Sequence, residues 1–319
     1  MLAVAVLVLV ALASIAIGAK ALSLDQVWHG LFHDTGTYGD VVVDERLART
    51  LLGLLAGAAL GLSGAVLQAL TRNPLADPGL LGINAGASAA VVTAITFFGV
   101  TSLSGYVWFA FLGAAAVGAL VWFLGGSRGA TPVRLALAGT AISAALYGYL
   151  QAVMIMDDAA LGRMRFWTVG SLASATNTTI AQVLPFLAAG TLLALALARP
   201  LNAMTMGDDT ARALGARPHR TRALAMLAAT VLCGAATAAC GPIVFVGLMV
   251  PHAVRSFTGP DLRWILPYAA VLSPVLLLGA DVVGRVVARP AELQVGIVTA
   301  VIGGPVFIFL VRRRRTAQL

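Results

Sequence analysis

The chain has 319 residues, of which 60% are hydrophobic and 11% are charged, and its mean hydropathy is +0.93. A soluble globular protein carries about 25% charged residues, so this composition excludes one. Runs of about 18 or more apolar residues recur along the chain, and each is long enough to cross a bilayer as a helix. The alternating segments of a membrane β-barrel do not occur. The sequence therefore predicts an all-α, polytopic membrane protein with a single transmembrane domain over residues 1–319.

The net charge of +8 does not indicate nucleic-acid binding, because the basic residues lie mostly in short loops, where they set membrane topology. Cys233 and Cys240 lie within one apolar segment. We expect buried packing residues there, not a disulfide or a metal pair. Residues 1–22 have no basic start and a long apolar part, so we expect the first membrane span rather than a signal peptide.

Ten membrane spans are predicted in chain order. They cover about 1–22, 47–70, 80–100, 106–125, 135–156, 180–198, 223–240, 242–256, 264–284 and 294–311. The second contains Gly53, Gly57 and Gly61, a row of small residues that allows neighbouring helices to approach closely. The eighth is short and ends at Pro251-His252. Ten spans place both termini on one side of the membrane. Most loop arginines lie on that side, so both termini are predicted to be cytoplasmic.

Two segments between these spans have a polar character of their own. Residues 23–45 are predicted to form an acidic loop, in which His29 and His33 are expected to be a solvated pair because no third metal ligand accompanies them. Residues 157–178 are amphipathic and are expected to hold a short helix at the membrane interface.

Residues 199–222 form the longest polar interruption in the second half of the chain. Asp208 or Asp209 could cap a first short helix, Gly215 suits its left-handed end, and Pro218 suits the first position of a second helix. A charged loop between membrane helices is the simpler alternative. We interpret the stretch as a cytoplasmic segment through which another protein acts on the membrane helices.

The chain lacks the motifs of a self-powered transporter or an enzyme. It has no G-x-x-x-x-G-K-[ST] sequence, and no Ser/His/Asp set or metal cluster has convincing spacing. The acidic residues Asp77, Asp157, Asp158, Asp281 and Glu292 fall at or near predicted span ends. This placement disfavours an ion-coupled secondary transporter, although a sodium site built from backbone carbonyls would escape the test. If the chain transports, the energy is expected from a partner.

Four blocks of the sequence resemble the FecCD-type permeases, which are the membrane subunits of ABC importers for ferric siderophores, haem and cobalamin. The blocks are RLARTLLGLLAGAALGLSGAVLQALTRNPLADPGLLG (46–82), MGDDTARALG (206–215), GPIVFVGLMVPHAVR (241–255) and ADVVGRVVARPAELQVGIVTAVIGGPVFIFLVRRR (280–314). The blocks are spread in order over most of the chain, from residue 46 to residue 314. The resemblance implies the type II ABC importer permease fold. By analogy it also implies a pathway for a ferric siderophore, with haem or cobalamin as alternatives.

The resemblance also implies roles for individual residues. The block 206–215 resembles the loop that enters a cleft on the ATPase subunit. This implies an ATPase-coupling role for Gly207, Asp208, Ala211, Arg212, Leu214 and Gly215. Asn73 and Leu75 match the family's cytoplasmic gate, and for Asn73 the alternative is that it starts an Asn-Pro turn.

Arg46, Arg49 and Arg285 match outer-face arginines that meet acidic residues of the substrate-binding protein. Charges at the rim of an interface steer docking and add modest affinity. An i,i+4 ion pair with Asp281 is the alternative for Arg285, and a local pair with Glu45 is possible for Arg46.

The partners implied are two cytosolic ATPase subunits, a second permease subunit that is either a copy or a sister, an extracytoplasmic substrate-binding protein and the lipid bilayer of the cytoplasmic (inner) membrane. No cofactor is expected in this chain, because ATP and Mg²⁺ would bind the partner ATPase. Hydrolysis would therefore occur in the partner and not in the permease.

Overall fold

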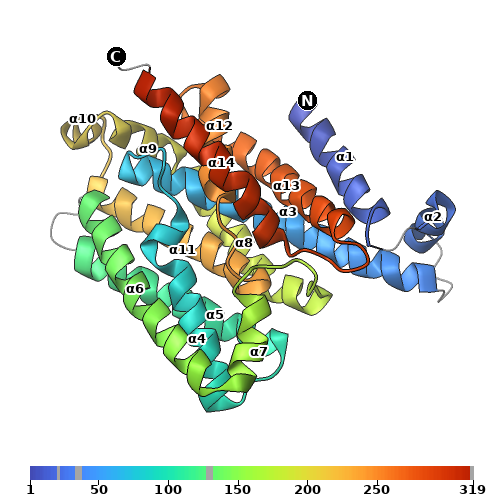
Figure 1. Ribbon diagram of the computed structural model, residues 1–319. Helices are drawn as coiled ribbons and strands as arrows, with labels where there is room; N and C mark the ends of the chain where they lie inside the picture. The colour runs from blue at the N-terminus through green and yellow to red at the C-terminus, as the bar shows by residue number, and fades with distance from the viewer. Residues whose placement is uncertain (20–21, 33–37, 127–131, 317–319) are drawn as a thin grey trace.

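The computed structural model describes residues 1–19, 22–32, 38–126 and 132–316, and over these ranges the only regular elements are helices (Figure 1). The helices are α1 (Leu2–Ala16), α2 (Leu24–Phe32), α3 (Tyr38–Thr71), η1 (Pro78–Leu81), α4 (Ile83–Phe98), α5 (Leu103–Gly126), α6 (Pro132–Met156), α7 (Asp158–Trp167), α8 (Asn177–Ala196), α9 (Ala198–Thr205), α10 (Asp208–Ala213), α11 (Pro218–Cys240), α12 (Val246–Thr258), α13 (Leu262–Val287) and α14 (Val295–Thr316).

The long helix α3 lies at the centre of the bundle and packs against α13, α11, α12 and α8 (Figure 1). In the most apolar window of α3 78% of the residues are buried, and the same share is buried in α11. The corresponding share in α6 is 17%, so α6 exposes most of its surface. The core of the protein is therefore built around α3 and α11, and α6 lies at the periphery of the helix bundle.

The predicted row of small residues on α3 forms its contact with α13 and α12. A methyl group added at Gly57 would lie 2.6 Å from the Cα atom of Pro274 in α13. Methyl groups added at Gly61 and Gly64 would overlap the Ser273 side chain and the carbonyl oxygen of Gly247. The close helix approach predicted from the glycine spacing is thus confirmed, and it is continued by Gly64 onto α12.

Helices α7, α8 and α13 begin at residues whose side chains accept hydrogen bonds from free backbone N–H groups. Asp157 accepts from Ala159 and Ala160 at the start of α7, Thr176 accepts from Thr179 in α8, and Asp261 accepts from Arg263 in α13. The interfacial helix predicted within 157–178 is therefore limited to α7. Residues 168–176 connect it to α8 without a further helix.

The predicted acidic loop at 23–45 is wrong for its described part, because α2 and the first turns of α3 occupy it. Val43 is fully buried, and a methyl group added at Gly30 of α2 would meet its side chain. Packing between α2 and α3 therefore extends α3 well beyond the span predicted from hydropathy. His33 lies outside the described residues, and His29 lies 3.7 Å from the carboxylate of Asp25.

Six described helices are long and apolar enough to cross a membrane, namely α3, α5, α6, α8, α11 and α13. Helices α1, α4 and α14 are apolar but shorter. Helix α12, which corresponds to the eighth predicted span, has 13 residues with Pro251 inside it. The protein is therefore a multi-pass helical membrane protein, and the count of ten spans stays a prediction.

Replacing Gly64 with alanine should lower the free energy of unfolding by about 1–3 kcal/mol, because the carbonyl of Gly247 cannot move aside without shifting α12. The measurement is the unfolding midpoint in mixed micelles titrated with SDS. The matched control is Gly279→Ala in α13, where an added methyl group meets no atom within 4 Å. Equal midpoints for the two variants would contradict the packing argument.

Candidate functional site

Residues 199–222, which we call the coupling segment, fold as most of α9, all of α10 and the first turn of α11. Figure 1 places α10 at the same end of the molecule as the C-terminal part of α14. Helix α9 was not predicted from the sequence, although Leu201 and Met204 are buried on one side of it. Apolar positions at helical spacing from Leu197 onward could have indicated this helix.

Helix α10 ends as predicted but does not begin as predicted. Gly215 adopts φ +81°, and its N–H donates to the Arg212 carbonyl, while Ala216 N–H donates to the Ala211 carbonyl. This is the left-handed helix end expected at Gly215. Neither aspartate caps the start, because Gly207 takes the N-cap position with φ +105° and α10 receives no side-chain cap. Asp208 is drawn instead into ion pairs outside the helix.

The residues assigned to ATPase coupling lie on two faces of α10. Ala211 is fully buried and Asp208 is partly buried. By contrast, 62% of the Arg212 side chain and 63% of Leu214 are exposed. An exposed leucine and an exposed arginine on a polar segment form a surface suited to a protein partner. Arg212 and Leu214, with the exposed Gly215 beside them, are therefore among the members of the block that a partner could touch directly.

Asp208 connects α10 to two other parts of the chain. Arg222 of α11 donates to both oxygens of its carboxylate, at 2.8 and 2.6 Å, and Arg72 donates to Oδ1 at 2.7 Å. The hydrogen bond from Arg222, followed by that from Arg72, lowers the pKa of Asp208 from its ordinary value. Asp208 therefore stays ionised below the usual aspartate range, and its stabilising contribution is lost only as the pH falls through that lowered value.

Arg72 opens residues 72–77, which we call the gate loop, between α3 and η1. Asn73 Oδ1 accepts a hydrogen bond from Leu75 N–H at 3.0 Å, so the turn proposed as the alternative role of Asn73 is formed. Asn73 also borders a cavity of about 310 Å³ between this loop and the beginning of α6. The cavity is lined by Leu67, Thr71, Asn73, Ala76, Leu81, Val133, Ala136, Leu137 and Thr140. The gate role of Asn73 and Leu75 stays a prediction.

The arginine cluster, Arg46, Arg49 and Arg285, is held by partners within the chain. Arg49 donates to both oxygens of Asp281, at 2.8 and 3.0 Å, and to Glu292 at 2.7 Å. Arg285 lies 3.1 Å from Asp281 and also donates to Ser14. The i,i+4 pair considered as the alternative for Arg285 is thus formed. The three residues are only 6%, 9% and 1% exposed, so they are not the rim charges expected from the sequence.

Helix α1 is tied to this cluster through its C-terminal carbonyl groups. Arg46 donates to the carbonyl oxygens of Ile15 and Ala16, both at 3.0 Å. A polar cavity of about 210 Å³ remains beside the three arginines. It is bordered by Ala19, Val42, Glu45, Arg46, Arg49, Ala173, Arg285 and Glu292. The docking role of the arginines stays a prediction, and its geometry would be a partner group entering this cavity.

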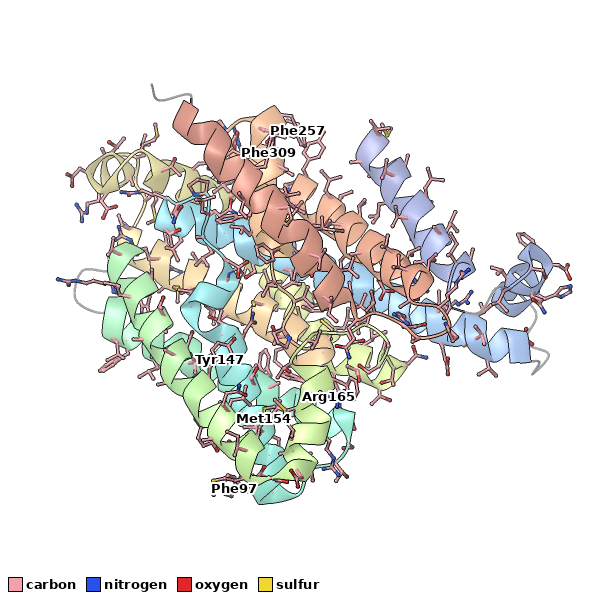
Figure 2. All side chains as sticks on the ribbon, in the orientation of Figure 1. Phe97, Tyr147, Met154, Arg165, Phe257 and Phe309 are labelled. Atoms are coloured by element: carbon pink, nitrogen blue, oxygen red, sulfur yellow. The ribbon has the colours of Figure 1, made fainter. Side chains whose placement is uncertain are left out.

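A third candidate surface lies on the exposed helix α6 and was not predicted from the sequence. Figure 2 shows Tyr147 and Met154 along α6, and both border a cavity of about 420 Å³. Its wall consists of Asn84, Ser88, Tyr147, Leu150, Gln151, Met154, Thr168, Val169, Pro242 and Val244. The spacing of Tyr147 and Gln151 by one helical turn inside an apolar span was the available signal. Exposed polar side chains within a membrane span favour a surface that faces a water-filled path over one that faces lipid.

The described residues contain no group of three or more His, Cys, Asp or Glu side chains that could hold a metal ion. Cys233 and Cys240 are buried free thiols. Ion pairs and hydrogen bonds build the coupling segment, the gate loop and the arginine cluster. The cavity of about 420 Å³ beside Tyr147, which we call the α6 cavity, is lined by neutral side chains.

The model of the FecCD transport family matches residues 6–313. The chain belongs to the FecCD transport family. It is 49% identical to the ferric enterobactin transport system permease protein FepD of Escherichia coli (strain K12), with 94% of this chain and 91% of that protein covered. It is 38% identical to the hemin transport system permease protein HmuU of Yersinia pestis, with 97% and 93% covered. The FecCD family is a transport family, not a family of enzymes.

A solved structure of a transporter has a similar fold. A chain described as an ABC transporter of the metal-chelate type in an inward-facing conformation superposes with a TM-score of 0.87 at 29% identity, covering 98% of this chain and 97% of that chain. The two chains thus share one fold over almost their whole lengths.

Asp281→Asn should lower the free energy of unfolding by about 3–5 kcal/mol, because it leaves the buried Arg49 and Arg285 without their shared carboxylate. The unfolding midpoint in mixed micelles measures this. Asp209→Asn is the control, since Asp209 is 99% exposed and pairs only within its own helix turn, where about 0.5 kcal/mol or less is expected. Similar midpoints for both variants would contradict a structural role for the cluster.

Proposed function

We propose that this chain is the transmembrane permease subunit of an ABC importer, and that it forms the pathway for a ferric siderophore across the cytoplasmic (inner) membrane. The observation that carries the proposal is the FecCD match together with an exposed coupling helix, α10, that presents Arg212 and Leu214. A substrate-binding protein would deliver the chelate, and two ATPase subunits would supply the energy.

The proposed topology has ten spans with both termini in the cytoplasm. Helix α12 counts as a span in this topology although it has only 13 residues and contains Pro251. Non-helical backbone before or after it is tolerated within a membrane where neighbouring helices bury it. In this topology the positive loops lie on the side of α10, and the positive-inside rule supports a cytoplasmic coupling segment that an ATPase could reach. The side chains of Arg312 to Arg315 lie outside the described residues.

Ferric siderophore is favoured as the substrate by the relatives. The relative FepD is named as a ferric enterobactin permease. An iron(3+)-hydroxamate import system permease of Bacillus subtilis is 40% identical to this chain. Haem is the second candidate, supported by HmuU, and cobalamin is the third. The α6 cavity adds a chemical argument, because its wall is made of neutral side chains that offer hydrogen bonds but no charge. Such a wall lets a bulky chelate pass without trapping it.

An ion-coupled secondary transporter is the alternative of another class. Such a carrier needs an ionisable group in the membrane that is free to bind and release its ion. Asp281, which lies within α13, holds Arg49 and Arg285 in ion pairs. Because these ion pairs occupy the Asp281 carboxylate, it is poorly suited to bind and release a coupling ion. Energy supplied by ATP hydrolysis in partner subunits is the better proposal.

In the proposed cycle, the permease subunits of a dimer enclose the pathway, and the exposed α6 surfaces line it. The second subunit is either another copy or a sister permease. ATP and Mg²⁺ bind the partner ATPases, and this chain contributes no cofactor site. Closure of the ATPases would displace α10, tilt the helices and change which side of the membrane the pathway opens to. The chain therefore acts as conduit and lever.

Replacing both Arg212 and Leu214 with aspartate should reduce uptake and substrate-stimulated ATPase activity at least tenfold, because both exposed contacts to the ATPase are lost. The complex is reconstituted in proteoliposomes with its binding protein and ATPase, and ferric enterobactin, haem and cobalamin are compared as substrates. Insertion and assembly should be unchanged. Normal coupling in this variant would remove the proposed role of α10.

Arg46→Gln should weaken docking of the substrate-binding protein at least tenfold and reduce the salt dependence of its affinity. The physical reason is that the cavity, which a partner carboxylate would enter, loses one of its positively charged guanidinium groups. Affinity is measured in nanodiscs over a range of salt concentrations. Arg163→Gln on the exposed surface of α7 is the control, and an equal effect of both variants would contradict docking at the cluster.

A further inference from the structure

The end of α3 carries an arginine at a backbone position that normally favours glycine. Arg72 adopts φ +50°, its N–H donates to the Ala69 carbonyl, and Asn73 N–H donates to the Gln68 carbonyl. Helix α10 ends with the same pair of hydrogen bonds, and there the equivalent residue is Gly215. Glycine adopts the left-handed conformation without steric cost, whereas an arginine is strained there. A strained residue points to a use for its side chain.

The side chain of Arg72 leads from this helix end to the coupling helix. Its Nη2 atom donates to Asp208 Oδ1 at 2.7 Å, and 39% of the side chain is exposed. Asp208 is fixed at the same time by Arg222, which is only 14% exposed. The Asp208 carboxylate at the start of α10 is thus held by Arg222 of α11 and accepts one further hydrogen bond, from Arg72 at the start of the gate loop.

Motion of Arg72 would pass directly into the gate loop. Asn73 follows it, and its side chain locks Leu75 N–H in a turn, while the Asn73 carbonyl accepts from Ala76 N–H. The loop continues into η1, which packs against α6. Asn73 and Val133 of α6 both line the 310 Å³ cavity. The loop is therefore a short, hydrogen-bonded connector between Arg72 and α6.

We propose that the Arg72–Asp208 ion pair is the link through which α10 moves the gate loop, so that Arg72 is a positioning residue for Asn73 and Leu75. This inference rests on the proposed function, because it assumes that a partner ATPase displaces α10. It adds a named connection between the coupling segment and the gate, which lie far apart in the sequence. Asp208 then faces the permease and acts as the inner end of the lever, while Arg212 and Leu214 form its outer end.

The competing explanation is that Arg72 only terminates α3. The two roles make opposite predictions for Arg72→Gly. Glycine suits the left-handed position better than arginine, so a purely structural residue would be replaced with no loss of function and with equal or greater stability. If Arg72 is the link, the same variant is at least as stable as the wild type but poorly coupled.

The test uses the complete importer, with permeases, ATPases and binding protein, in proteoliposomes. Arg72→Gly should leave the unfolding midpoint equal or higher and should lower ferric enterobactin uptake per ATP hydrolysed at least about fivefold, the lower end of typical coupling effects. Asp208→Asn should produce a similar loss. Arg72→Lys, which keeps the charge, should retain more coupling than Arg72→Gly.

The matched control is Arg263→Gln. Arg263 is another exposed arginine bonded to an aspartate, Asp261, in its own helix turn. Asp261 is joined to α9 by Asn202, which donates to it at 2.6 Å, so that connection does not depend on Arg263. Its uptake per ATP should equal that of the wild type. A loss of coupling in this control equal to that of Arg72→Gly would overturn the proposal, because removal of any exposed arginine would then suffice.

A measurement without substrate separates this inference from the proposed function. A fluorophore on Leu75→Cys, with Cys233 and Cys240 buried and unreactive, should change its emission when ATP and vanadate are added. Arg72→Gly should reduce that change at least about fivefold. A full change in Arg72→Gly would overturn the link. A wild-type complex that gives the change but takes up no ferric siderophore would instead refute the proposed substrate and leave the link supported.

Discussion

Close packing of α3 against α13 and α12 is the constraint on which the rest of the structure depends. Inside a bilayer, helices gain nothing from leaving water, so they associate through van der Waals contact at small residues. Gly57, Gly61 and Gly64 place the backbone of α3 directly against its neighbours. At about 1.5 Å per residue, the 34 residues of α3 form a rod about 50 Å long. Its packing therefore fixes the positions of the arginine cluster near its first turns and of the gate loop after its last turn.

The two ends of this rod carry the two polar sites. Arg46 and Arg49 lie in the early turns of α3 and are enclosed by the ends of α1 and α13. Arg72 lies just beyond the last turn and reaches α10. Buried arginines are stable only with a carboxylate or carbonyl partner, which explains why the first end is self-contained. The second end stays partly exposed, so its ion pair can be broken and formed at lower cost.

Hydropathy and turn chemistry predicted the parts of the fold that depend on local sequence. The helical class, the glycine row, the left-handed Gly215 and the start of α11 at Pro218 follow from single residues and their spacing. Helices α2 and α9 were missed because their stability comes from packing against neighbours, which a hydropathy profile does not record. The cap predicted at Asp208 or Asp209 is wrong, because Gly207 occupies the N-cap position. The carboxylate of Asp208 instead accepts hydrogen bonds from Arg72, 136 residues away, and from Arg222, 14 residues away.

The same limit applies to the candidate sites. The fold brings Arg46, Arg49 and Arg285 together around one cavity. Their burial depends on Asp281 and Glu292, whose positions only the folded chain reveals. The block at 206–215 likewise did not distinguish exposed from buried members. Helical position decides this: Arg212 points outward while the adjacent Ala211 packs inward. A motif therefore identifies which residues act together, and the fold decides which of them touch a partner.

A transporter driven from outside the membrane needs parts that move as units joined by contacts that can change. The glycine-packed core meets the first need, since such an interface shifts as a whole or not at all. Helix α10 contributes no residue to the described apolar core, so its displacement must reach the gate loop through a contact of its own. The Arg72–Asp208 ion pair joins the end of α3 to a helix that Arg222 holds on α11. In the proposed link, this contact passes a displacement of α10 to the gate loop.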